Sequence, residues 1–251
     1  MKIGMFPGSD SSCDPHTPPR LRYHRRVPER LPSPRFLYLH GFASGPRSAK
    51  GVAFADHFAQ RGAAVQRLDL RVPSLEHLRL STMIDIVRAA IGGPRERAVL
   101  IGSSLGGLCA ARVAEDDPRV GGLVLLAPAF RMIERWARRL GDDAWQAWRR
   151  DGFLAIEDYA ERRPARVDIG FADDAAAVDA EGGGWPDVRV PTVILHGRGD
   201  ETVDIELSRE FAASRRHVRL VELDDGHELV ASLPAILAEA DAFLAPWLGP
   251  G

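Results

Sequence analysis

The feature of this sequence that most constrains its fold is the segment at residues 98–107, Ala-Val-Leu-Ile-Gly-Ser-Ser-Leu-Gly-Gly. The apolar run at residues 99–101 has the length of a strand buried on both faces, and residues 108–115 are rich in helix formers. Between them a Gly-x-Ser-x-Gly pattern centres on Ser104. This pattern is typical of a nucleophile elbow, a sharp strand-to-helix turn that holds its serine strained and exposed above a sheet.

The glycines of this pattern have a steric purpose in such a turn. Gly102 and Gly106 have no Cβ, so the incoming strand and the outgoing helix can approach closely, and N–H groups at the helix start point towards developing negative charge. By itself, a glycine-rich turn with an incidental Ser104 explains the pattern about equally well. The surrounding elements therefore decide between the two interpretations.

Strands and helices are expected to alternate along most of the chain. Apolar runs predict strands at residues 36–39, 64–70, 99–101, 120–126, 192–195 and 218–223. Helical periodicity predicts helices from Ser48 to a stop at Gly62, and at residues 81–91, 108–115, 205–214 and 229–247. This order predicts an α/β protein with a mostly parallel, doubly wound sheet covered by helices on both faces.

The regular alternation breaks twice, which defines the expected domain organisation. A chain of 251 residues, 45% hydrophobic, can bury one large core, and we expect a single domain at residues 35–251. Residues 129–189 contain several tryptophans and indicate a small helical cap insertion. Residues 1–34 are rich in proline and arginine without periodicity and are expected to be a disordered leader; a targeting segment and a start codon assigned too early are both open.

Composition excludes several classes of partner. A formal net charge of −2 gives no general attraction to nucleic acid, and no apolar run approaches the length of a membrane span. Cys13 and Cys109 form neither a disulfide framework nor a metal-ligand spacing, so a reducing, cytoplasmic location is expected. Residues 102–107 lack the Gly-x-Gly-x-x-Gly spacing of a dinucleotide site, and no cofactor is expected. The oligomeric state stays open.

Three candidate catalytic residues each follow a predicted strand. Ser104 follows the strand of the elbow, Asp200 follows the next-to-last strand and His227 follows the last. In an open parallel sheet, residues just beyond the carboxyl ends of strands meet in space. The order Ser, Asp, His is the triad order of the α/β-hydrolase fold. A serine hydroxyl needs a nearby base, and a histidine needs a carboxylate to fix its tautomer, so we expect His227 as base and Asp200 as orienting acid.

Other residues of the same types compete for these roles. Asp204 and Asp225 are rivals of Asp200. The remaining histidines have structural explanations, because they are expected at buried strand ends, on the surface, in a loop or in the leader: His40, His196, His57, His217, His77, His16 and His24. For the tetrahedral intermediate, the backbone N–H groups of Leu105, which follows the nucleophile, and of Phe42, which follows His40-Gly41, are the expected oxyanion donors.

These motifs carry a family resemblance. Residues 37–50 (Leu-Tyr-Leu-His-Gly-Phe-Ala-Ser-Gly-Pro-Arg-Ser-Ala-Lys), Gly-Ser-Ser-Leu-Gly-Gly at 102–107 and Asp-Gly-His at 225–227 resemble the small bacterial YqiA-type esterases of the α/β-hydrolase superfamily. The resemblance covers residues 36–251 and implies cofactor-free hydrolysis of short acyl esters, or of acyl-CoA thioesters, through the same triad. The elbow is also similar to that of a mitochondrial protein depalmitoylase. Residues 129–189 match nothing residue by residue, so the substrate does not carry over.

Two further alternatives are open. A non-catalytic binding or scaffold module is disfavoured, because it would have no physical need to keep the triad and oxyanion positions together. Hydrolysis of a peptide or carbon–carbon bond stays open, because the cap sets the leaving group. Within the cap, arginines at 131, 135, 138 and 139 recur at helical spacing after Pro128. A solvated surface is the simpler explanation, but Arg131, Arg135, Trp136 and Arg139 are candidate substrate-binding residues that could meet a phosphate-bearing leaving group.

Overall fold

A computed structural model describes residues 34–181 and 184–248 of the chain. Apart from Pro34, the leader expected at residues 1–34 lies outside the described residues. No helix within the described ranges is long and apolar enough to cross a membrane.

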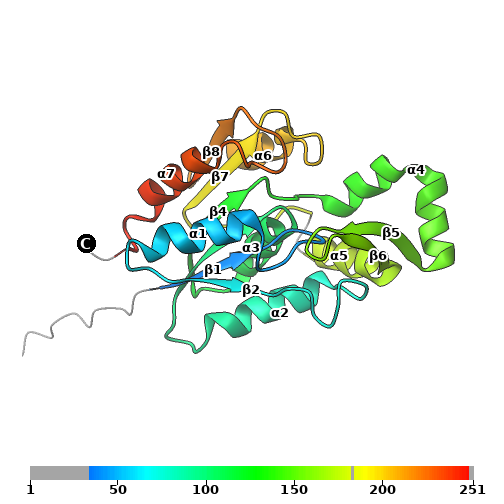
Figure 1. Cartoon of the computed structure of the whole chain (residues 1–251), viewed down its shortest axis with the longest axis horizontal. Coiled ribbons are helices and arrows are strands. Elements are labelled where there is room, and N and C mark those ends of the chain that lie inside the picture. Colours follow the sequence, from blue (N-terminus) through cyan, green and yellow to red (C-terminus); the bar gives the residue numbers. More distant parts are fainter. Residues whose placement is uncertain (1–33, 182–183, 249–251) are drawn as a thin grey trace, which may run out of the picture. The chain divides into compact units, whose positions relative to one another are not determined.

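Six strands form one parallel sheet in the order β2-β1-β3-β4-β7-β8 (Figure 1). They are β1 (Arg35–Leu39), β2 (Val65–Leu68), β3 (Ala98–Ser103), β4 (Val120–Leu126), β7 (Thr192–Gly197) and β8 (Val218–Leu223). The chain runs from β1 outwards to β2 and then crosses back to β3. The strand order therefore reverses between β1 and β3, and ligands of open α/β sheets bind beyond the carboxyl ends of strands at such a switch point. The predicted α/β class is confirmed.

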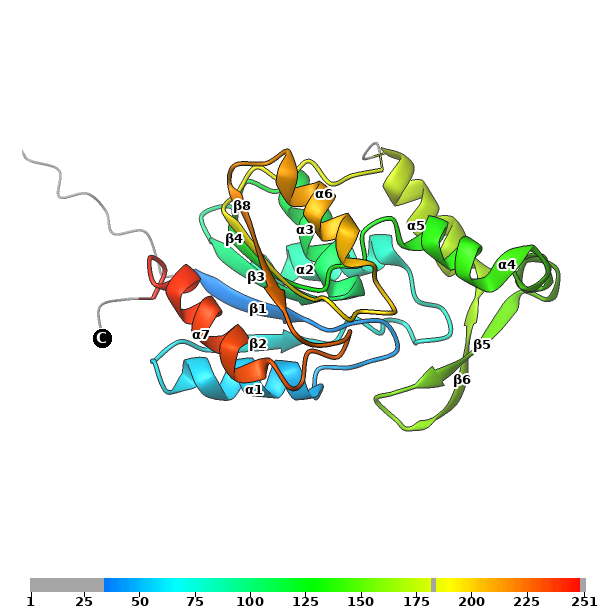
Figure 2. The same cartoon turned by 90° about the horizontal axis from the view of Figure 1, so that it is seen from above.

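Helices cover both faces of this sheet (Figure 2). On one face lie α1 (Ala49–Ala59) and α7 (Leu233–Leu244), and on the other lie α2 (Leu80–Ile91), α3 (Leu105–Asp116) and α6 (Ile205–Ala213). Successive side chains of a strand point to opposite faces. Accordingly, Phe36 and Tyr38 of β1 belong to the apolar cluster under α1 and α7, whereas Leu37 and Leu39 belong to the cluster on the other face.

The insertion between β4 and β7 contains more than the expected helical cap. It comprises α4 (Met132–Asp151), an antiparallel hairpin of β5 (Phe153–Asp158) and β6 (Arg163–Asp168), and α5 (Ile169–Glu181). Along β5 exposed residues alternate with less exposed ones, which is the period of a strand with one covered face. We did not predict this hairpin, because alternation over so short a segment is a weak signal. Gly141, with φ of 75°, interrupts α4 with a kink.

Two helices begin three or more residues away from their predicted starts. Helix α3 begins at Leu105, directly after the elbow serine, rather than at residue 108. Helix α7 begins at Leu233 rather than at residue 229, because Leu229 has a positive φ of 54° and the cap of the helix is Ser232. Because α7 begins later than predicted, the segment after β8 is not helical and forms the turn that carries His227.

Candidate active site

Ser104 occupies a strained turn between β3 and α3. Its φ of 53° and ψ of −115° lie outside the regions that non-glycine residues prefer, which costs on the order of 1–3 kcal/mol. The neighbouring glycines permit the turn. A Cβ on Gly102 would lie 2.4 Å from the backbone oxygen of Gly106, and a Cβ on Gly106 would lie 2.2 Å from that of Leu39. Since both obstacles are backbone atoms, neither position tolerates a side chain without a backbone shift.

A chain of hydrogen bonds connects Ser104 to His227 and Asp200. His227 Nε2 lies 3.1 Å from Ser104 Oγ, and His227 Nδ1 lies 2.7 Å from Asp200 Oδ2. The arrangement suits donation by the Ser104 hydroxyl to Nε2 and by the Nδ1–H group to the carboxylate. Thus the structure brings together all three residues singled out in the sequence, each from the loop beyond a different strand.

The Asp200 side chain is fully buried and surrounded by hydrogen-bond donors. Its Oδ1 accepts hydrogen bonds from the backbone N–H groups of Thr202 (2.8 Å) and Val203 (2.7 Å), while Oδ2 lies between His227 and His196 Nε2, the latter at 3.1 Å. Burial by itself raises the pKa of the Asp200 carboxyl, but the hydrogen bonds from His196, His227 and Val203 outweigh burial and lower that pKa well below its usual value. This shift favours the ionised carboxylate of Asp200 at neutral pH.

The two rival carboxylates have other contacts. Asp204 caps α6 by accepting a hydrogen bond from the backbone N–H of Glu206. Asp225 accepts from the backbone N–H groups of Gly226 (2.7 Å) and Ser232 (2.8 Å) and so shapes the turn that contains His227. Burial raises the pKa of Asp225, but these N–H donors outweigh it and lower the pKa. Neither rival is hydrogen-bonded to His227 within the described residues.

The expected oxyanion donors flank Ser104. A Cβ on Gly41 would lie 3.4 Å from the Cβ of Ser104, so the segment beyond β1 passes directly beside the serine. Neither the N–H of Phe42, the next residue in this segment, nor that of Leu105 donates a hydrogen bond to another group in residues 34–181 and 184–248. Two backbone donors close to a strained serine are what a developing oxyanion requires.

The insertion packs against residues 41–43, the Phe42 segment, which contains one of the expected oxyanion donors. The Phe42 ring packs edge-on against Trp136 of α4, with ring centroids 4.9 Å apart, and at 5.4 Å from Phe171 of α5. At the tip of the β5–β6 hairpin, the Tyr159 N–H donates to the backbone oxygen of Ala43 at 2.9 Å. Trp136, a candidate substrate-binding residue, therefore contacts the Phe42 segment.

The cap arginines are engaged with protein groups. Arg135 donates to the backbone oxygen of Thr202, and Arg139 donates to that of Glu201 at 3.4 Å, so both contact the loop that carries Asp200. Arg131 and Arg138 form ion pairs with Glu134. Arg131 has a left-handed backbone conformation and precedes α4, which takes it out of the predicted helical register. A small hollow of about 430 Å³ lies between Arg135, Trp136 and the Asp200 loop.

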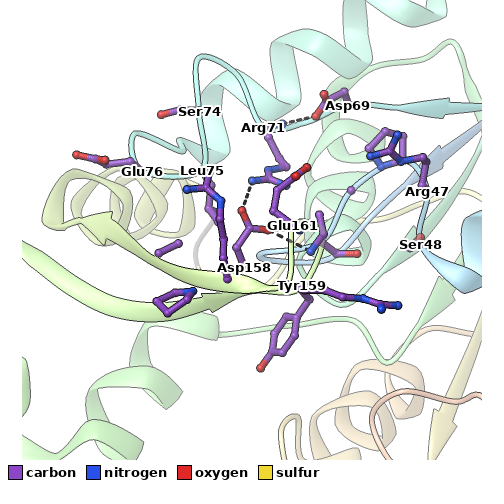
Figure 3. A pocket seen from close by; sticks show the side chains of 18 of the residues that line it. Arg47, Ser48, Asp69, Arg71, Ser74, Leu75, Glu76, Asp158, Tyr159 and Glu161 are labelled. Atoms are coloured by element: carbon purple, nitrogen blue, oxygen red, sulfur yellow. Dashed lines mark hydrogen bonds and ion pairs between the residues drawn. The ribbon is translucent and has the colours of Figure 1, made fainter.

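A larger groove, of about 1390 Å³, opens between the β5–β6 hairpin and the loops that follow β1 and β2. Figure 3 shows that the side chains of Arg71 and Asp158, which both line this groove, point towards each other and meet in a 2.6 Å ion pair, while the Tyr159 ring points away from them. Its wall includes residues 44–49, which directly continue the Phe42 segment. The groove therefore begins next to the Phe42 segment.

Two residues near the triad were not assigned a role from the sequence. Lys50 donates from Nζ to the backbone oxygen of Glu228 at 2.8 Å, directly after His227, and burial lowers its pKa. The signal was present, since Lys2 and Lys50 are the only lysines of this arginine-rich chain. His196 was expected to be a buried strand-end residue, and it is fully buried, but its contact with Asp200 was not foreseen.

Comparison with known proteins agrees with this fold. The mouse alpha/beta hydrolase domain-containing protein 10 is 19% identical, with a TM-score of 0.70 over 85% of this chain and 90% of that one. Est1E from Butyrivibrio proteoclasticus with ferulic acid bound is 21% identical, with a TM-score of 0.70 over 86% and 90%. An esterase domain from Rhodothermus marinus is 21% identical, with a TM-score of 0.60 over 88% and 90%. At these identities the likeness shows the fold.

The chain thus has the α/β-hydrolase fold, as its motifs indicated. The model of the Uncharacterised protein family (UPF0227) matches residues 35–244, and the chain belongs to that family. No curated protein sequence matches the chain significantly.

Proposed function

We propose that this protein is a serine hydrolase that cleaves carboxylic esters through an acyl-enzyme. The observation that carries the proposal is the hydrogen-bonded chain from Ser104 through His227 to the buried Asp200, starting from a strained serine. Strain is retained where the surrounding structure over-determines it, and functional sites are where such residues cluster. The esterase names of Est1E and of the Rhodothermus marinus domain support an ester as substrate.

In the proposed first half-reaction, Ser104 Oγ attacks the carbonyl carbon of the ester while its proton passes to His227 Nε2. The carbonyl oxygen becomes an oxyanion and accepts hydrogen bonds from the N–H groups of Phe42 and Leu105. When the tetrahedral intermediate collapses, the bond to the alkoxy group breaks and His227 donates its proton to the leaving alcohol. Asp200 stays ionised and stabilises the imidazolium.

The second half-reaction repeats these steps with water. His227 Nε2 accepts a proton from water as the water oxygen attacks the acyl carbon, and the second tetrahedral intermediate expels Ser104 Oγ, which regains a proton from His227. A carboxylic acid leaves and the free enzyme is restored. We assign one arm of the ester to the groove beside the Phe42 segment, because the groove wall at residues 44–49 directly continues that segment. A short to medium acyl ester is the proposed substrate.

The test is covalent labelling by a fluorophosphonate, followed by turnover of p-nitrophenyl esters of increasing chain length. Wild-type protein should be labelled at Ser104, and Ser104→Ala should lose both labelling and turnover while its thermal midpoint changes little. Ser103, the buried neighbour of Ser104, offers a matched Ser103→Ala control that should still be labelled. Undiminished labelling of Ser104→Ala contradicts the proposal. Acyl-CoA and S-acyl peptides in the same panel decide whether a thioester is preferred, since the same triad serves both.

A further inference from the structure

His196 lies at the end of β7 and is the second histidine in contact with Asp200. Its imidazole is fully buried, and its Nε2 lies 3.1 Å from Asp200 Oδ2 and 2.9 Å from the backbone oxygen of Val203. On the other side of the ring, Nδ1 lies 2.7 Å from Ser208 Oγ of α6, and Ser208 is also fully buried. All polar atoms of the ring are therefore engaged inside the protein.

The neighbours of His196 determine its tautomer. A carboxylate oxygen and a carbonyl oxygen can only accept hydrogen bonds, so Nε2 must carry the proton. In the neutral imidazole, Nδ1 is then an acceptor and receives the hydroxyl proton of Ser208. The result is a directed chain in which Ser208 donates to His196 and His196 donates to Asp200.

This chain acts on the same oxygen that serves the triad. Asp200 Oδ2 accepts from His227 Nδ1 at 2.7 Å and from His196 Nε2 at 3.1 Å. The other oxygen, Oδ1, is held by the N–H groups of Thr202 and Val203. Without His196, the oxygen that orients the catalytic imidazole would have one fixed partner instead of two. Small displacements of an orienting group lower turnover strongly, because the reacting atoms must be aligned.

We propose that His196, with Ser208 behind it, is a positioning residue that holds the Asp200 carboxylate in line with His227. The proposal rests on the proposed hydrolase function, because it assigns His196 to the orientation of that triad. It differs from a purely structural role in one respect. A structural histidine would affect stability alone, whereas a positioning residue affects kcat in protein that is still folded.

Substitutions at one position separate these roles. Leucine at position 196 removes the donor, whereas glutamine provides an amide N–H at about the place of Nε2. We expect His196→Leu to lower kcat for a p-nitrophenyl ester roughly 10- to 100-fold, the range for losing a hydrogen bond to a charged group, with KM changed by less than about twofold. His196→Gln should recover most of this loss. His217→Leu is the control, since His217 donates to the backbone oxygen of Val188 before the amino end of β8, away from the triad.

A second measurement does not depend on turnover. The proton that His227 Nδ1 donates to Asp200 should give a low-field ¹H resonance in the wild-type protein. In His196→Leu this resonance should broaden or disappear as the carboxylate loses its second partner, and Ser208→Ala, which leaves Asp200 and both imidazoles intact, should weaken it to a lesser degree. If His196→Leu is too unstable to purify, Ser208→Ala and His196→Gln carry the comparison.

Opposite results overturn the inference. An unchanged resonance together with kcat within about twofold of wild type in His196→Leu shows that His196 does not position Asp200. Equal loss in His196→Gln and His196→Leu shows that packing, and not the donor, matters. These outcomes are distinct from failure of the proposed function, in which wild-type Ser104 takes up no fluorophosphonate even though the resonance is present.

Discussion

His227 Nε2 lies 3.1 Å from Ser104 Oγ although 123 positions separate the two residues in the chain. Strands β3 and β8, which deliver them, are themselves separated in the sheet by β4 and β7. The turn after β8 therefore has to reach back over β7 towards the elbow. Within this turn, Asp225 accepts a hydrogen bond from the Gly226 N–H. Lys50 of α1 donates to the backbone oxygen of Glu228, the residue after His227.

The proposed role of Asp200 as the orienting carboxylate predicts that replacing its carboxylate by an amide lowers turnover strongly. Asp200→Asn should leave a folded protein but lower turnover on the order of 10⁴-fold, because an amide no longer fixes the imidazole tautomer or stabilises the imidazolium. Asp204→Asn is the matched control, since Asp204 caps α6 and does not contact His227. Initial rates with a p-nitrophenyl ester measure both. A greater loss in Asp204→Asn or Asp225→Asn would show that another carboxylate orients the base.

The close packing at the elbow predicts that one added methyl group at Gly106 lowers the stability of the protein. Gly106→Ala places a Cβ 2.2 Å from the backbone oxygen of Leu39, so β1 and α3 must move apart. We expect the free energy of unfolding to fall by about 1–3 kcal/mol or more, measured by denaturant titration. Gly93→Ala is the control, because nothing lies within 4 Å of its Cβ, and it should change stability by less than about 0.5 kcal/mol. Equal stability of the two variants would contradict the tight packing at the elbow.

Features of the fold and the site could be predicted from the sequence where their signal lies within one short segment. β4 and β8 were predicted at residues 120–126 and 218–223, as observed, because long apolar runs and flanking turns are local features. The α/β fold class followed from them and is confirmed. The triad remains a prediction, but its geometry was foreseeable from the rule that strand ends meet at one edge of a parallel sheet.

What could not be predicted depends on contacts between distant segments. The ion pair of Arg71 and Asp158 connects the β5–β6 hairpin to the loop after β2, and no local sequence pattern indicates such a pair. His196 was correctly expected to be buried, yet its hydrogen bonds to Asp200 and Ser208 require knowing that the loop after β7 folds back over the strand end. Likewise, the arginines of α4 have a helical period, but sequence does not tell which loop they touch.

The buried side chain of His40 should make the free energy of unfolding depend on pH. Nδ1 of His40 contacts the backbone oxygen of Gly41 at 2.9 Å, and Nε2 accepts from the Leu70 N–H at 3.1 Å, which a protonated ring cannot do. Burial lowers the pKa of His40; the hydrogen bond to the Gly41 backbone oxygen and the charge of Asp69 oppose this shift, and the charge of Arg71 reinforces it. Below about pH 6.5 the unfolded chain therefore binds a proton that the folded chain does not.

The consequence has a definite sign. The stabilisation from neutral His40 is complete above about pH 6.5 and is lost as the pH falls towards the lower folded-state pKa, with a slope of at most ~1.4 kcal/mol per pH unit. Denaturant titrations between about pH 5 and 8 should show a shallower decline for His40→Gln, in which no ring can be protonated. Parallel curves for the two proteins would mean that His40 is protonated equally in both states.

The last prediction separates two roles of the α4 arginines. Arg135 donates to the backbone oxygen of Thr202, in the loop that carries Asp200, and burial lowers the pKa of Arg135. We expect Arg135→Gln to lower kcat for neutral and charged substrates alike, because the loop that carries Asp200 loses this contact. Arg139 is more weakly held, at 3.4 Å from Glu201 O, and its guanidinium can turn towards a phosphate.

If the helix meets a phosphate-bearing leaving group, Arg139→Gln should raise KM for acyl-CoA, by an amount that shrinks as salt is added, and leave a neutral p-nitrophenyl ester unaffected. Arg138→Gln is the matched control on the same helix, because its side chain is 75% exposed and pairs with Glu134. Exposed ion pairs of this kind contribute about 0–1 kcal/mol, so this variant should behave as wild type towards both substrates. A KM unchanged by Arg139→Gln at low salt would contradict phosphate recognition by Arg139 and would leave its contact with the backbone oxygen of Glu201 as the explanation of its position.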